Sequence, residues 1–189
     1  LALGLYNVQG TARASGVTLD ETVTTLALLA PNFNSSAEAG NAMKNMLLSL
    51  QAKTPAAAEA MAEMGLLTEK GNSAFYDAKG HFIGMRETAA KLNKALGGLS
   101  EAQKTQALRT IFGNDALNAA NTLLSQGADG YDAMAASMTK QLGVAAQAAL
   151  KQQGFNTAVD NLMGSLEALQ ITVFSRVLPA LTGLVNLIA

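Results

Sequence analysis

Repeated helix-start signals constrain the fold of this chain more than any other feature. Thr18 and Glu21 have the spacing of a capping box. In such a box the hydroxyl and the carboxylate each accept a hydrogen bond from a backbone amide that the first helical turn leaves unpaired. Comparable starts occur at three other places: Ser35 with Glu38, Ser100 with Gln103, and Thr54 followed by Pro55. These signals predict four helices.

Apolar residues behind each start recur every three or four positions, the period of an amphipathic helix. The eight methionines follow the same spacing, which favours core filling over an adaptable binding surface. Short breaks separate the segments, at Pro31-Asn32, Gly97-Gly98, Gly113-Asn114, Gln126-Gly127 and Gly154. The pattern predicts a mainly all-α fold of multi-helix hairpins in series.

One segment departs from the helical pattern. Apolar pairs flank residues 77–80, where Asp77 suits the start of a type I turn and Gly80 suits the left-handed position that follows. We therefore expect one small β-hairpin near residues 74–83.

The last part of the chain reads as one long element. From residue 155 onward the apolar spacing is helical, and Pro179 is expected to bend the helix. We expect a helical domain with the hairpin insert over residues 1–154 and a long amphipathic helix over residues 155–189. Because the chain begins at Leu1 and stops within an apolar run, we interpret it as an excerpt of a longer protein.

Composition narrows the function classes. Charged residues are 14% of the chain against 49% hydrophobic residues, and the formal net charge is −1. Such a surface repels other copies weakly, so self-association is expected. With 13 basic and 14 acidic residues and no basic cluster, sequence-specific nucleic-acid binding is disfavoured. The absence of cysteine excludes disulfides and thiolate metal sites within the chain.

No group of residues predicts catalysis, a metal site or a cofactor. His81 is the only histidine, so a histidine-based triad cannot form within one chain, and a place on the hairpin surface is expected. Glu59 and Glu63 lie one helical turn apart, but without apolar enclosure they indicate a solvated face. Asp77 and Gly80 lack the alternating oxygen ligands of a calcium loop.

Residues 171–189 raise the question of a membrane, because Arg176 is their only charge. Polar residues nevertheless form a stripe along one side, at Thr172, Ser175, Arg176, Thr182 and Asn186. This pattern favours an amphipathic helix packed on partners, and a helix lying in a membrane interface stays open as the alternative.

Read in order, three groups of segments resemble the phage tail tape measure family in its conserved helical region. They are residues 14–22 with 26–30, residues 36–47, and the turn at 77–80 followed by 99–104 and 111–117. The resemblance covers about residues 10–185, and the loop at residues 32–34 departs from it. The family-like structural motif comprises Gly16, Thr18, Glu21, Glu38, Gly40, Asp77, Gly80, Ser100, Phe112 and Gly113.

The resemblance implies a protein that lies in the lumen of a phage tail and sets tail length as tube subunits polymerise around it. The implied partners are other copies of itself, tail tube and tail tip or baseplate proteins, and a tail assembly chaperone. The implied location is the virion, with the host cytoplasm during assembly, and genome delivery is a possible further role. The alternative is a segment released into the host envelope that perturbs the membrane. Some members of the family carry cell-wall-degrading domains elsewhere in their chains, and no residue here extends that activity to this segment.

Overall fold

The structure is a computed structural model that describes the backbone of residues 1–152 and the side chains of residues 1–140. Seven α-helices and one 3-10 helix make up the described part: α1 (Ala2–Ala14), α2 (Leu19–Leu29), η1 (Ala30–Asn32), α3 (Ser36–Ser49), α4 (Pro55–Glu63), α5 (Met85–Leu96), α6 (Glu101–Phe112) and α7 (Asn114–Gln152). The prediction of a mainly α-helical fold is confirmed.

All four predicted helix starts are confirmed. Thr18 and Ser100 form complete capping boxes at the beginnings of α2 and α6. Thr54 accepts a hydrogen bond from the amide of Ala57 and is followed by Pro55 in the first turn of α4. The side chain of Ser35 caps α3, but its box is incomplete because the Glu38 carboxylate accepts from the amide of Asn34 at 3.3 Å.

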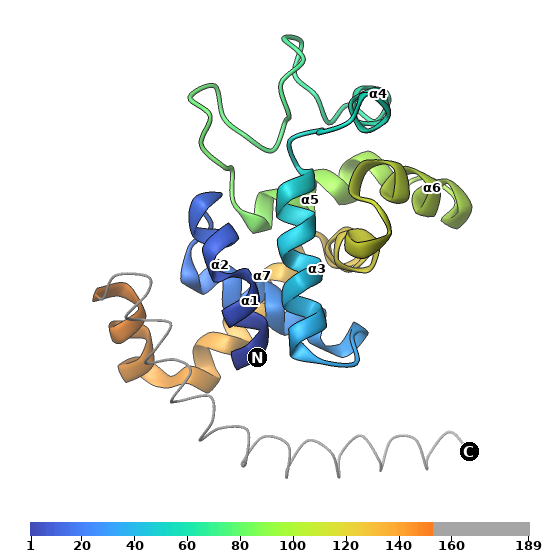
Figure 1. Cartoon of the computed structure of the whole chain (residues 1–189). Helices are drawn as coiled ribbons and strands as arrows, with labels where there is room; N and C mark the ends of the chain where they lie inside the picture. Colours follow the sequence, from blue (N-terminus) through green and yellow to red (C-terminus); the bar gives the residue numbers. More distant parts are fainter. Residues whose placement is uncertain (153–189) are drawn as a thin grey trace, which may run out of the picture.

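The helices do not form a simple series of hairpins. α1 packs most extensively on α3, and α5 packs most extensively on α7, so the largest contacts join helices that are not consecutive (Figure 1). α7 also contacts α2, α3 and α6 and serves as the central support of the domain. Several helices contact more than one neighbour, so their apolar faces close around a shared core.

The core is one continuous apolar cluster that draws on all seven α-helices of the described residues and on the segment between α4 and α5. Its largest fully buried side chains include Leu5, Leu26, Met43, Met46, Phe75, Met85 and Leu92. Full burial of such a side chain contributes about 1.5–3 kcal/mol relative to leaving it in water. Core filling is confirmed for the buried methionines of the described residues.

The predicted β-hairpin at residues 74–83 is not supported, since residues 1–152 contain no strand. The turn exists: the Asp77 amide donates to the His81 carbonyl at 2.8 Å, and Gly80 has φ +83. Pairing stops at a single antiparallel bridge between Tyr76 and Phe82. The residues that precede the bridge pack against the domain: Phe75 is fully buried, and the Ser73 hydroxyl donates to the Leu50 carbonyl at 2.6 Å.

The break predicted at Gln126-Gly127 is a bend within α7 rather than its end. Gly127 has φ +59, in the left-handed region that favours glycine, while helix continues on both sides. The Asn93 side-chain amide of α5 donates to the Leu124 carbonyl at 2.9 Å, one turn before the bend. The bend lets both halves of α7 follow the core.

Some expectations fall outside the described residues. They are the break at Gly154, the domain boundary after residue 154, and the helix over residues 155–189 with its bend at Pro179. They stay predictions.

Candidate functional site

The most elaborate polar arrangement in the described residues centres on the Glu21 carboxylate. Its Oε2 atom accepts hydrogen bonds from the Thr18 amide at 3.0 Å and the Thr18 hydroxyl at 2.9 Å, which completes the cap of α2. Its Oε1 atom accepts from the Met85 amide, the first of α5, at 2.9 Å. One carboxylate therefore satisfies the N-terminal amides of two helices, where negative charge is also favoured by the helix dipoles.

Gly84 makes this double cap possible. It adopts φ +97, and a Cβ atom placed there would lie 2.8 Å from the Glu21 Oε1 atom. A side chain would therefore push the carboxylate away from α5. A glycine is required both by the backbone conformation and by this close approach.

Tyr131 of α7 brings a third helix to the same junction. Its hydroxyl donates to the Glu21 backbone carbonyl at 3.2 Å, and the residue is only 4% exposed. Burial raises the pKa of Tyr131, so the hydroxyl stays protonated and able to donate. We call the contacts of Glu21 with Thr18, Met85 and Tyr131 the α2–α5–α7 junction.

An ion pair extends the junction toward solvent. The Arg86 Nε atom lies 2.8 Å from Asp132 Oδ1, the Nη2 atom lies 2.9 Å from Oδ2, and Nη1 contacts Glu87 at 2.7 Å. The hydrogen bonds from Arg86 hold the pKa of Asp132 below its ordinary value. Since these side chains are about half exposed, the pair aligns α5 and α7 more than it stabilises them.

A second special contact lies where α1 crosses α3. A Cβ atom added to Gly40 would come within 2.6 Å of the Gly4 Cα atom, so the two backbones touch. Nearby, the Asn7 side-chain amide donates to the Ala37 carbonyl at 3.2 Å. Only glycine at this crossing permits such an approach.

The family-like motif residues do not converge on one pocket. Thr18 and Glu21 belong to the α2–α5–α7 junction and Gly40 belongs to the α1–α3 crossing. Others occupy helix ends, turns and the core: Gly16, Gly80 and Gly113 have positive φ, Asp77 anchors the 77–81 turn, Glu38 and Ser100 stand at helix starts, and Phe112 is buried. What these residues share is a structural role, because each caps a helix, forms a turn, permits a close helix contact or fills the core.

Sequence reasoning missed several residues of these contacts: Gly4, Gly84, Arg86, Asn93, Tyr131 and Asp132. The helix α1 itself was also not predicted, because it begins at Leu1 with no side-chain cap. Gly84, directly before the apolar spacing that starts at Met85, was the one local signal available. The other partners lie far apart along the chain.

The described residues offer little for catalysis or metal binding. No group of three or more His, Asp or Glu side chains in residues 1–140 is arranged to hold a metal ion. His81 is exposed as expected, with its Nδ1 atom 3.2 Å from an Asp77 carboxylate oxygen. The amides of His81 and Lys79 both donate to Asp77, and these bonds, that of His81 foremost, lower its pKa. Across the described part of the chain, no helix is long and apolar enough to cross a membrane.

Glu59 and Glu63 lie on the exposed face of α4, as expected, but they also line a groove. The groove runs between α4 and α6, has a volume of about 370 Å³, and is lined by both apolar and polar side chains.

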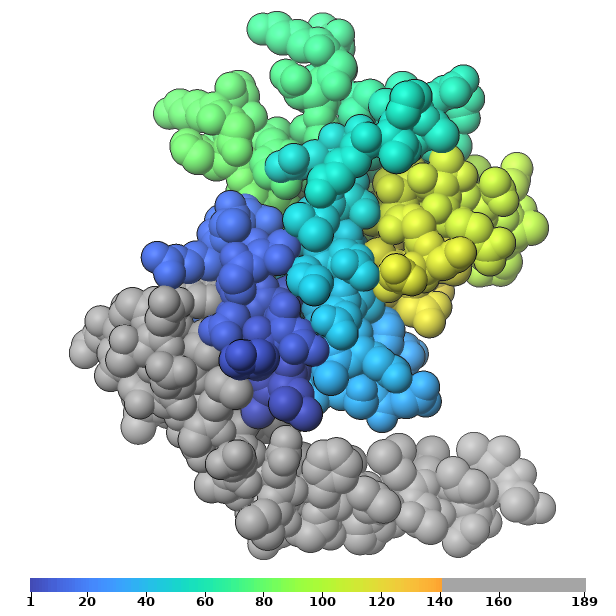
Figure 2. Space-filling model, viewed as in Figure 1, coloured from blue at the N-terminus to red at the C-terminus, as the bar shows by residue number. Residues whose placement is uncertain are grey.

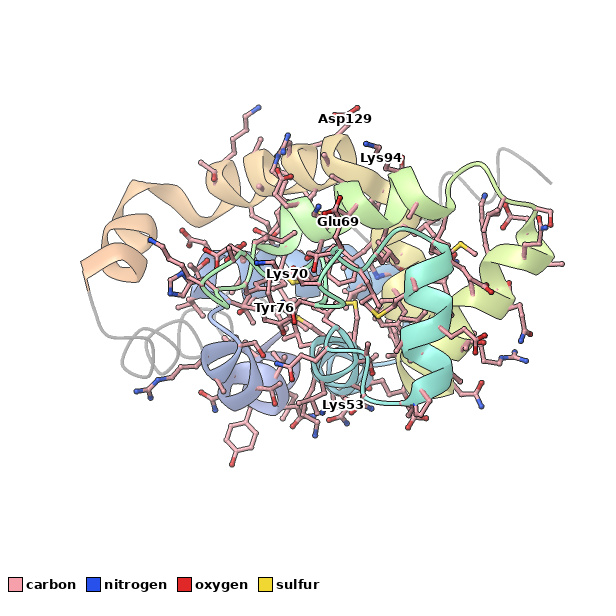
Figure 3. All side chains as sticks on the ribbon, turned by 90° about the horizontal axis from the view of Figure 1, so that it is seen from above. Lys53, Glu69, Lys70, Tyr76, Lys94 and Asp129 are labelled. Carbon is pink, nitrogen blue, oxygen red and sulfur yellow. The ribbon has the colours of Figure 1, made fainter. Side chains whose placement is uncertain are left out.

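The segment that connects α4 to α5 carries Glu69, Lys70 and Tyr76, which Figure 3 shows across the middle of the molecule.

Comparison with known proteins places these features in a family. Residues 1–113, more than half of the chain, match the family described as phage-related minor tail protein. The tape measure protein of Pneumococcus phage Dp-1 is 27% identical over all 189 residues, which cover 16% of that protein. The probable tape measure protein of Escherichia phage P2 is 29% identical over 164 residues, which are 84% of this chain and 18% of that protein.

The chain thus spans less than a fifth of the length of these curated relatives. No solved structure matches it.

Proposed function

This chain belongs to the phage-related minor tail protein family, and from that membership we propose that it is a structural segment of a phage tail tape measure protein. The observation that carries the proposal is the similarity to the Dp-1 tape measure protein along the whole chain. The polar side chains that cap helices and the glycines that let α1 and α3 touch serve helix packing, which supports a structural role.

In this proposal the segment lies in the tail tube lumen of the virion and takes part in tail assembly and the setting of tail length. Its partners are other copies of itself, tube subunits, tip or baseplate proteins and, in the host cytoplasm, a tail assembly chaperone. Genome delivery is a further role of the same protein. The abundance of small apolar side chains and the net charge of −1 support packing against copies and neighbours.

The compact fold makes a quantitative test of length setting possible. Residues 1–152 in one continuous helix would span roughly 230 Å, whereas a compact domain of that size is roughly 40 Å across. An in-frame deletion of these residues in the parent phage should therefore shorten the tail by roughly 40 Å or less if the segment stays folded in the lumen. Electron microscopy of tails measures the difference.

A variant with the same number of residues separates the effect of folding on tail assembly from the effect of chain length on tail length. Gly40→Ala disrupts the α1–α3 crossing and leaves the number of residues constant, so tail assembly should fail or slow while any completed tail keeps its normal length. Gly10→Ala, on an open face of α1, is the matched control and should assemble normally.

Normal, infectious tails shortened in proportion to the deleted residues would contradict a specialised structural role and would indicate a simple ruler. Tails shortened by roughly 40 Å or less, or a loss of tails in the deletion, would support the proposed role where the Gly10→Ala phage assembles normally.

A further inference from the structure

The groove between α4 and α6 combines an apolar floor with an acidic rim. Ala60, Met64 and Leu99 are partly buried against the core and line the floor together with Ala107. Glu59 and Glu63 line the groove from the α4 side, and no Lys or Arg is among its lining residues. Figure 2 shows α4, in teal, at the surface on one edge of the molecule. An apolar floor beside exposed carboxylates is a surface suited to an amphipathic helix.

The two rim carboxylates have no partner among the described residues, unlike most other glutamates there. Glu21, Glu38, Glu87 and Glu101 each accept hydrogen bonds within the domain. Glu59 and Glu63 make no ion pair or hydrogen bond with residues 1–140. Two unpaired negative charges one helical turn apart, next to apolar surface, select an occupant that carries a positive charge.

The chain itself contains a segment with the complementary pattern. Residues 171–189 carry a single charge, the cation Arg176. Their apolar residues recur every three or four positions, at Val173, Val177, Leu181, Leu184 and Ile188. An apolar stripe with one cation beside it matches a groove with an apolar floor and two carboxylates on its rim.

Geometry favours a neighbouring copy over the same chain as the source of this segment. Figure 1 places the described end of α7 and the α4–α6 pair on opposite sides of the molecule. About 24 residues separate Gln152 from Arg176, and if they are helical, as their apolar spacing predicts, they advance only about 36 Å, close to the width of the domain. A straight helix of that length could not turn back around its own domain, so this predicted helix would reach the groove of another molecule.

We propose that the α4–α6 groove receives residues 171–189 of a second copy, with Arg176 placed between Glu59 and Glu63. This inference deepens the proposed function, because it names the surface through which copies of the segment pack head to tail. The apolar floor provides the contact area and the charge pair sets the register.

Disulfide trapping tests the proposal in the full 189-residue chain, which has no cysteine of its own. One preparation carries Gln106→Cys on the groove and another carries Ser175→Cys beside Arg176. When the two are mixed under mild oxidation, a disulfide-linked dimer should form about tenfold faster than in either preparation alone. The double variant at high dilution should stay free of an internal disulfide.

Charge reversal makes the test specific. Glu59→Lys with Glu63→Lys in the groove preparation should reduce trapping about tenfold, and Arg176→Glu in the other should do the same. Combining the reversed groove with Arg176→Glu should restore it. Glu69→Lys, a reversal at an exposed glutamate away from the groove, is the control and should leave trapping unchanged. Circular dichroism of each variant checks that the fold is retained.

Three results would overturn the proposal. The first is a trapping rate that the charge reversals leave unchanged, and the second is an internal disulfide in the dilute double variant. The third is faster trapping when the cysteine is placed on α1 by Tyr6→Cys, at a residue that is 62% exposed, than when it is placed in the groove. Because the experiment uses purified chain, its failure would leave the phage deletion result intact. A phage result against the structural role would likewise leave the trapping result interpretable.

Discussion

The α1–α3 and α4–α6 pairs are both formed by helices that pack on each other, yet one is closed and the other is open. At the α1–α3 crossing Gly4 and Gly40 bring the backbones into contact, and no space is left between the helices. Between α4 and α6 the side chains hold the helices apart around a groove of about 370 Å³. The size of the residues at a crossing decides how closely two helices approach.

The polar groups follow the same division. The Glu21 carboxylate at the α2–α5–α7 junction accepts hydrogen bonds at two helix starts, whereas Glu59 and Glu63 at the α4–α6 groove make no hydrogen bond or ion pair with the described residues. Removing a carboxylate that accepts hydrogen bonds within the domain should lower the free energy of unfolding. Removing Glu59 or Glu63 should leave that free energy unchanged and affect association alone. Substitutions in both regions test this difference, and they are described below from the largest expected change in stability to the smallest.

The largest effect is expected where the closed pair is forced open. Gly40→Ala places a methyl group against the Gly4 backbone, which cannot move aside as a side chain can. We expect a loss of about 3 kcal/mol in the free energy of unfolding and a melting temperature lower by about 10 °C. Thermal denaturation followed by circular dichroism measures it.

The control for this prediction is Gly10→Ala in the same helix. A Cβ atom at Gly10 meets nothing within 4 Å, so alanine should raise stability by up to about 1 kcal/mol through helix propensity. Equal effects at the two glycines would show that the α1–α3 crossing is not closed in solution.

The next effect is expected at the junction carboxylate. Glu21→Ala removes an acceptor from the starts of both α2 and α5, and each cap contributes about 1 kcal/mol, so a loss of about 2 kcal/mol is expected. Urea denaturation measures it. Glu63→Ala is the matched comparison and should change stability by less than about 0.5 kcal/mol. If Glu63→Ala proved as destabilising as Glu21→Ala, the distinction between bonded and free carboxylates would fail.

A smaller effect is expected at the bend of α7. Gly127→Ala puts a side chain at φ +59 and should cost about 1 kcal/mol. Asn93→Ala, which removes the bond to the Leu124 carbonyl at the same bend, should cost a similar amount. The double variant should lose less than the sum, because both changes act on one bend. Strict additivity in chemical denaturation would argue against this coupling.

The smallest effect is a difference in acid sensitivity. Arg86 lowers the pKa of Asp132 in the folded state, so the unfolded state binds the proton more readily. The stabilisation is complete above the unfolded pKa and is lost as pH falls through the folded pKa, below about pH 4. Asp132→Asn should flatten the fall in melting temperature between pH 5 and pH 2. An unchanged pH profile would mean that the pair contributes nothing to folding.

Local signals were enough to locate helix starts and turns. Thr18, Thr54 and Ser100 cap their helices as their spacing predicts, and Gly80 occupies a left-handed position in the 77–80 turn. Each of these features depends on bonds between residues at most four positions apart, so a short stretch of sequence contains all the partners. The resemblance to the tape measure family rested on such stretches and is confirmed.

Contacts between distant segments could not be read in this way. The capping-box spacing identified Glu21 as a local cap, but its second partner, the Met85 amide, is 64 positions away, and the Tyr131 hydroxyl bonded to its carbonyl is 110 positions away. The hairpin expected near residues 74–83 is reduced to a turn with one bridge between Tyr76 and Phe82, and Phe75 beside it is fully buried. Residue order therefore specified where helices begin and turn, whereas the Glu21 double cap, the Gly4–Gly40 contact and the α4–α6 groove arose only when the folded core brought separate helices together.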